Sequence, residues 1–179
     1  MKITIMIAAA CAVLAGDALA QTPRTTPARP ASAGAAQPAP ALQDFVNKVA
    51  ISDMFEVQSS QLALEKQPDR DTKPFAQRMV KDHQQTTKEL KALVDSGKVK
   101  ATLPTALDSE HQKMLDELKG KSGKDFDQSY DQMQVKGHQD AVALFDAYAK
   151  GGDNADLKKW AAKMLPHIKQ HLAMAQKLK

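Results

Sequence analysis

Apolar residues recur three and four positions apart through most of the chain that follows residue 40. This spacing is typical of amphipathic α-helices, whereas the alternation of half-buried strands is absent and β-branched residues are few. The pattern predicts four long helices and one short helix, over residues 41–66, 71–97, 108–119, 122–150 and 153–178. The domain is therefore expected to be all-α.

Capping residues mark the predicted ends of these helices. Asp71 is the expected N-cap of the second helix, and Gly97 is the expected residue just past its end. The segment "SGKD" at 122–125 has the serine and the acidic residue of a capping box. Asp153, followed three residues later by Asp156, is the expected N-cap of the last helix.

The connections between these helices indicate the topology. Short loops join the first long helix to the second and the third to the fourth. About 25 residues, including the short helix, separate the second long helix from the third. Two hairpins joined by one long crossover predict a ferritin-like four-helix bundle with a long crossover carrying a short extra helix.

The N-terminal residues predict export. Residues 1–20 combine Lys2, an apolar stretch and the small-residue sequence "ALA", which indicates a secretory signal peptide cut after Ala20. The alternative is lipoprotein processing at Cys11, which is the only cysteine of the chain. Residues 21–40 are rich in Pro and Ala and predict a disordered linker, so the bundle domain is expected over 41–179. The expected location is the periplasm, with outer-membrane association as an alternative.

The net charge of +4 would suit a nucleic-acid ligand. Predicted export and the wide spread of the lysines argue against nucleic acid. The last helix is more basic than the others and is a candidate for weak contact with anionic envelope lipid. The sequence identifies no protein partner.

A layer of polar residues interrupts the predicted apolar stripes. In a ferritin-like bundle, one such residue from each long helix falls at a similar height along the bundle axis. These residues are Glu56, His83, His138 and His171, joined by His167 one turn before His171. Two interpretations are open: a metal-free hydrogen-bonded network in which Glu56 and Asp82 accept from imidazoles, and a mononuclear metal site.

The metal interpretation assigns one candidate ligand to each helix, namely Glu56, His83, His138 and His171. Asp82 and His167 would support a ligand or act as alternates. Three nitrogens and one carboxylate suit one Zn or Cu ion, and suit Fe less well. His111, on the short helix, is expected to lie at the surface.

Catalytic motifs are scarce. A di-iron carboxylate site needs Glu-x-x-His motifs, and the sequence contains none. Nucleophile elbows, phosphate loops and a cysteine nucleophile in the exported chain are absent as well. These absences argue against an enzyme, and a di-iron-type oxidoreductase is the weakest of the functions considered.

The chain resembles an exported bacterial ferritin-like "domain of unknown function" family, often labelled putative outer membrane protein. The resemblance covers about 41–178 and depends on Glu56, "RMVKDH" (78–83), "FDQSY" (126–130), "GHQDAV" (137–142), and Leu165, Pro166 and His171. It implies a ferritin-like bundle outside the cytoplasm and no established activity. It also implies that Glu56, Asp82, His83, His138 and His171 belong to the family pattern, whereas His167 replaces an expected small residue such as Thr.

Two functions follow from these observations. The first is a non-catalytic periplasmic binding or envelope-stress protein with a buried Glu/His polar layer. The second is a protein that binds a single Zn, Cu or Fe ion through that layer.

Overall fold

The computed structural model describes residues 38–66 and 68–178. These residues belong to one compact unit. The predicted signal peptide and most of the predicted linker lie outside the described residues.

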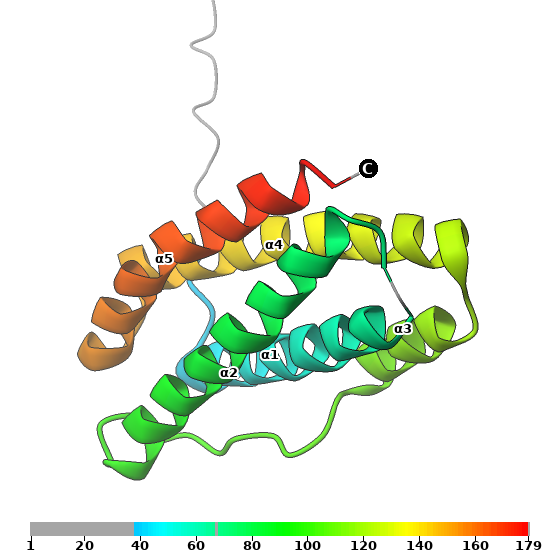
Figure 1. Ribbon diagram of the computed structural model, residues 1–179. Coiled ribbons are helices and arrows are strands. Elements are labelled where there is room, and N and C mark those ends of the chain that lie inside the picture. The colour runs from blue at the N-terminus through cyan, green and yellow to red at the C-terminus, as the bar shows by residue number, and fades with distance from the viewer. Residues whose placement is uncertain (1–37, 67, 179) are drawn as a thin grey trace, which may run out of the picture. The chain divides into compact units, whose positions relative to one another are not determined.

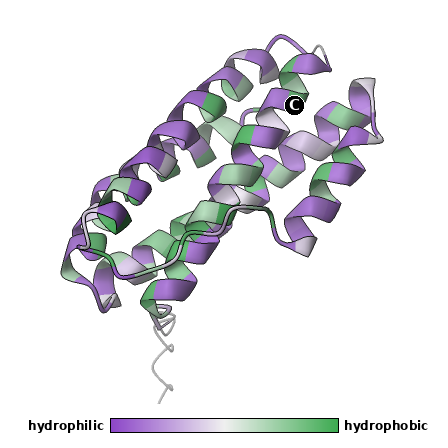
Figure 2. Cartoon of the chain, turned by 90° about the horizontal axis from the view of Figure 1, so that it is seen from below, coloured by the Kyte–Doolittle hydropathy of each residue, from purple (hydrophilic) through white to green (hydrophobic). Residues whose placement is uncertain are grey.

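Five α-helices and no strand are present in the described part of the chain, as predicted. Their bounds are α1 Leu42–Glu65, α2 Thr72–Asp95, α3 Ser109–Lys119, α4 Gly123–Gly151 and α5 Ala155–Ala175. Each helix carries both apolar and polar residues, as an amphipathic helix requires (Figure 2). Among the described helices, none combines the length and the apolar character that a membrane span requires.

Asp71 occupies the N-cap position of α2, as predicted. The Asp71 side chain makes no capping hydrogen bond. Instead, Asp69 Oδ1 accepts hydrogen bonds from the backbone N–H groups of Asp71 at 2.9 Å and Thr72 at 2.7 Å. The carboxylate that stabilises this helix start therefore lies two residues earlier than predicted.

Ser122 occupies the predicted N-cap position of α4, whereas the predicted N-cap of α5, Asp153, was wrong. Ser122 makes no side-chain capping hydrogen bond at the start of α4. Asn154 caps α5, where its Oδ1 accepts from the backbone N–H of Leu157 at 2.9 Å. Asp153 instead accepts the hydroxyl hydrogen bond of Tyr148 at 2.8 Å, so its carboxylate ties α5 to the end of α4.

The helices form the two hairpins that the sequence predicts, α1 with α2 and α4 with α5 (Figure 1). The hairpins contact each other through α1 with α4 and through α2 with α5. The connection from residue 96 to residue 108 runs along the bundle to α3, which packs on α1 and α4 (Figure 1). This arrangement is the predicted ferritin-like bundle with a crossover helix.

Two apolar clusters fill the core, one toward each end of the bundle. The first gathers the N-terminal parts of α1 and α5 with the C-terminal parts of α2 and α4, and includes Phe45, Leu90, Phe145, Leu157 and Trp160. The second gathers the opposite helix ends with α3, and includes Phe75, Met79, Leu118, Phe126 and Tyr130. Between the two clusters lie the buried polar residues Asp53, Glu56, His138 and His171.

Candidate metal centre

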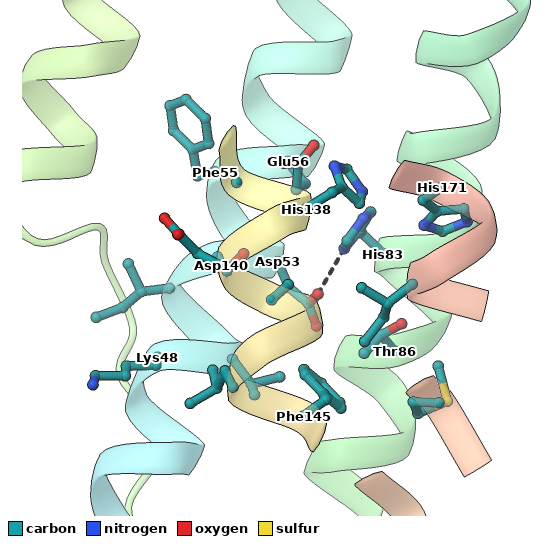
Figure 3. A pocket seen from close by; sticks show the side chains of 18 of the residues that line it. Lys48, Asp53, Phe55, Glu56, His83, Thr86, His138, Asp140, Phe145 and His171 are labelled. Carbon is teal, nitrogen blue, oxygen red and sulfur yellow. Dashed lines mark hydrogen bonds and ion pairs between the residues drawn. The ribbon is translucent and has the colours of Figure 1, made fainter. Parts of the chain in front are cut away.

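Three histidines from three different helices meet in the polar layer. His83 lies on α2, His138 on α4 and His171 on α5, and their ring centroids are 5.5–5.7 Å apart. His138 is 2% exposed and His171 is 4% exposed, and the side chain of His83 is 12% exposed. Figure 3 shows the three rings directed toward a common region.

One ring nitrogen from each histidine lies within 4.8 Å of one from each of the other two. Three such atoms fit inside a circle of radius 4.8/√3, so a single point lies within about 2.8 Å of all three nitrogens. A Zn–N bond is about 2.0–2.1 Å long, so each ring would need to move inward by about 0.7 Å to bind a common ion.

The outer nitrogen of each ring is hydrogen-bonded to an oxygen of the protein. His83 Nδ1 shares a hydrogen bond with Asp53 Oδ1 at 2.7 Å. His138 Nδ1 donates to the backbone oxygen of Gln134 at 2.8 Å. His171 Nε2 donates to Asp82 Oδ2 at 2.9 Å. The bonds of His138 and His171 place a ring proton on the hydrogen-bonded, outer nitrogen, and the other nitrogen of each ring is the inner one.

The inner nitrogens have no hydrogen-bond partner. His83 Nε2, His138 Nε2 and His171 Nδ1 are all buried and unpaired. A buried polar atom without a partner costs about 1–3 kcal/mol. Each of the three histidines therefore buries one ring nitrogen that pairs with no group of the described residues.

Burial keeps two of these imidazoles neutral. It lowers the pKa of His83 to about 4, against the opposing influence of Glu56. Burial also lowers the pKa of His171 to about 4, although the hydrogen bond to Asp82 acts to raise it. Both rings are therefore free of the extra proton at neutral pH, which is the state that a metal requires of its ligands.

Carboxylates surround the triad. Burial raises the pKa of Asp53 well above its usual value, although the Thr87 hydroxyl acts to lower it. Burial acts to raise the pKa of Asp82, but hydrogen bonds from His171 and Arg78 outweigh this influence and the pKa is lowered. Of the residues that the structure describes, no lysine or arginine is buried. The negative charge near the triad therefore has no buried cationic partner from the protein.

Glu56 lies beside the triad. Its side chain is directed into the layer next to His138 (Figure 3), the residue is 3% exposed, and its Oε2 atom is buried without a partner. It accepts no hydrogen bond from an imidazole among those of the described residues, so the predicted metal-free network does not form at Glu56. Its oxygens also lie outside the group of three mutually close ligand atoms.

The remaining predicted residues take different places. Asp82 accepts the hydrogen bond of His171, which is the supporting position predicted for it. His167 is exposed and is not part of the triad. His111 is only partly exposed, because its ring donates to Asp108 at 2.7 Å and packs on Phe55.

Sequence reasoning missed Asp53, which is buried and holds His83. The buried positions of α1 include Val46, Val49, Asp53, Glu56, Ser60 and Ala63, which alternate spacings of three and four residues. That spacing was the available signal for Asp53. The same spacing also allows Ser52, which lies three residues after Val49 and four before Glu56, but Ser52 is only half-buried. The Gln134 contact could not be predicted, because a backbone carbonyl leaves no mark in the sequence.

A pocket of about 1130 Å³ reaches the triad. Its lining includes the three histidines together with Asp53, Glu56, Asp82 and the exposed His167. Apolar side chains of α1, α4 and α5 line it as well, among them Val49, Phe145 and Ile168. The three histidines therefore line this pocket, while their unpaired ring nitrogens stay buried from solvent.

These features define an all-α bundle protein whose core holds a cluster of converging histidines. The chain belongs to the family described as Domain of unknown function (DUF4142), whose model matches residues 27–178. This match confirms the domain-of-unknown-function part of the resemblance noted above. Export and outer-membrane association stay predictions.

A solved structure described as "CopM in the Cu(II)-bound form" has a similar fold. The TM-score is 0.63 at 17% sequence identity, over 78% of this chain and 95% of that one. At this identity the similarity shows the fold alone. Among curated proteins, no relative matches the sequence.

Proposed function

We propose that this protein binds one transition-metal ion through His83, His138 and His171. The observation that carries the proposal is the convergence of three buried, unpaired ring nitrogens from three helices. A hydrogen-bonded network would pair such atoms with one another or with Glu56. Here each ring is instead hydrogen-bonded through its outer nitrogen and leaves the other nitrogen buried without a partner.

Imidazole nitrogens favour ions of the zinc and copper class. Among divalent first-row ions, Cu²⁺ generally binds nitrogen sites most tightly, so we expect the order Cu²⁺ above Zn²⁺. The similar fold of the protein described as "CopM in the Cu(II)-bound form" is consistent with this order. Asp53 and Glu56 would offset the charge of a divalent ion, because both lie in the same buried layer.

The proposed role is binding rather than catalysis. If the predicted signal peptide is used, the domain acquires its ion in the periplasm. The protein would then buffer or carry copper or zinc in the cell envelope.

Metal titration of the purified full chain tests this proposal. Isothermal calorimetry with Cu²⁺ and with Zn²⁺ should show one equivalent bound per chain, and elemental analysis of the loaded, desalted protein should recover it. His171→Ala should abolish this binding. His167→Ala is the matched control, because this exposed histidine lies one helical turn away on the same helix. Equal loss in both variants, or no binding by the unmodified chain, would contradict the proposal.

A further inference from the structure

The histidine triad leaves a bound ion incompletely coordinated. In the described part of the chain, the only group of three or more converging ligand atoms is that of His83, His138 and His171. Zinc prefers four ligands, and sites with three protein ligands keep a water molecule or a substrate in the fourth position. The fourth ligand must therefore come from solvent or from a residue that lies farther away.

Space for such a ligand is present. The three histidines and Glu56 line the same pocket of about 1130 Å³. A water molecule occupies about 30 Å³ in the liquid, so the pocket admits water and small molecules alike. A fourth ligand would therefore enter the polar layer from the side of this pocket.

Glu56 is the group best placed to hold that ligand. Its Oε2 atom is buried without a partner, and the side chain lies next to His138 (Figure 3). Its other oxygen, Oε1, lies 3.5 Å from the position that a Cβ on Gly137 would occupy, so α4 closely covers this carboxylate. The carboxylate is outside the group of converging ligand atoms and yet adjacent to it.

We infer that Glu56 does not bind the ion directly but accepts a hydrogen bond from an exchangeable water that completes the coordination. This inference rests on the proposed metal binding. Glu56 would then position the fourth ligand without binding the ion, and the fourth ligand would be a small molecule that can donate a hydrogen bond. A carboxylate accepts hydrogen bonds and repels anions. Small neutral molecules that can donate a hydrogen bond are therefore favoured in the fourth position over anions that cannot.

Azide is a suitable probe, since it binds copper and has no proton to donate. In Cu²⁺-loaded protein at neutral pH, azide should bind weakly, as followed by electron paramagnetic resonance and by absorption. Glu56→Gln keeps the shape of the side chain, removes its charge and adds an N–H donor. We expect this variant to bind azide at least tenfold more tightly and to keep its Cu²⁺ affinity within about tenfold.

Asp140→Asn is the matched control, because Asp140 is an exposed acid that lines the same pocket. It should leave azide affinity unchanged. Glu56→Ala serves as a second variant: it should also strengthen azide binding, and its thermal unfolding establishes that the bundle is intact. Pulsed resonance in D₂O should detect an exchangeable water beside copper in the unmodified protein.

Three results would overturn the inference. A loss of Cu²⁺ affinity of a hundredfold or more in Glu56→Gln, with no exchangeable water in the parent, would make Glu56 a direct ligand. Equal azide affinity in the parent and in Glu56→Gln would show that Glu56 does not face the fourth position. If the parent bound neither copper nor zinc, the proposed function would fail together with this inference. In the other two results the parent still binds metal, so only the inference fails.

Discussion

The described part of the bundle buries unpaired side-chain atoms in the histidine layer and, on α4, at Gln134 and Asp131; the histidine layer and Asp131 differ in what they can hold. In the histidine layer, three rings from three helices each bury an unpaired nitrogen, and one nitrogen of each ring lies within 4.8 Å of one from each of the others. At Asp131 on α4, which is 8% exposed, Oδ2 is also unpaired, and Oδ1 accepts only a long 3.5 Å hydrogen bond from the Thr72 hydroxyl. Burial and the nearby Asp69 and Asp127 raise the pKa of Asp131 to about 6.

The difference shows that burial of a polar group does not by itself indicate a binding site. The histidines have proton acceptors behind them and lone pairs in front, so a cation would relieve the cost of their burial. Asp131 instead faces other carboxylates, and those oxygens are not part of a converging group of ligand atoms among the described residues. Asp131 therefore lowers the stability of the folded state whenever its carboxyl group is charged.

The largest expected effect is the loss of metal binding when one histidine is removed. His138→Ala leaves two nitrogens where three converge, and no other described histidine joins the group. We expect Cu²⁺ affinity to fall more than a hundredfold in a competition titration with a chelator, which corresponds to more than about 2.7 kcal/mol. A loss of less than about fivefold would place the ion elsewhere.

A smaller loss is expected when a supporting carboxylate becomes neutral. Asp53→Asn keeps an oxygen that can accept from His83, but it cannot become the carboxylate that a bound cation would favour and that would make the ring a stronger donor to metal. Changes of this kind cost about 10–100-fold in metal affinity. The same chelator competition measures it, and Asp140→Asn controls for the loss of one negative charge. An unchanged affinity would mean that the charge of Asp53 has no influence on the ligand.

Removing the charge at Asp131 should affect stability and not metal binding. The folded-state pKa of Asp131, about 6, lies above the usual value of 3.8. Protonation of Asp131 therefore contributes its full stabilisation below about pH 4, and this stabilisation is lost as the pH rises through 6. Asp131→Asn should therefore raise the free energy of unfolding at pH 7 by about 1 kcal/mol, allowing for solvent screening.

Thermal unfolding of the Asp131→Asn variant at pH 4 and at pH 7 measures this effect. The gain should be present at pH 7 and should disappear near pH 4, where the parent carboxyl is itself protonated. An equal gain in stability at both pH values would show that the substitution acts through packing and not through charge. Metal affinity, measured in parallel, should stay the same.

The smallest effect is expected at His167. This residue is exposed and lies outside the converging group, although it is one helical turn from His171. Cu²⁺ affinity of His167→Ala should stay within about twofold of the parent in the same titration. A tenfold loss would show that the ion recruits His167 as a further ligand.

Much of the fold could be predicted because helix periodicity and loop length are local properties of the sequence. Apolar spacing identified the buried faces of the long helices, and the long connection before α3 required a crossover. Cap residues were less predictable, since Asp69 and Asp71, or Asp153 and Asn154, are chemically similar neighbours. Which of two adjacent side chains reaches the free N–H groups depends on the loop backbone.

The candidate site could be predicted only in part. His83, His138 and His171 fell at a common height because each sits on or beside the apolar stripe of its own helix. The choice between Ser52 and Asp53 depends on how α1 is rotated against its neighbours, which periodicity alone does not determine. The hydrogen bonds of the outer ring nitrogens and the offset of Glu56 are tertiary features, and neither leaves a mark in the sequence.

The residues of the triad come from both hairpins: His83 belongs to the first, while His138 and His171 belong to the second. Between those hairpins the backbone runs only through the crossover that contains α3. An ion held by all three rings would act as a removable cross-link in a chain whose sole cysteine is Cys11. Chelation should then loosen the contact between the hairpins before either hairpin opens, so the metal supply of the surroundings would set how rigid the domain is.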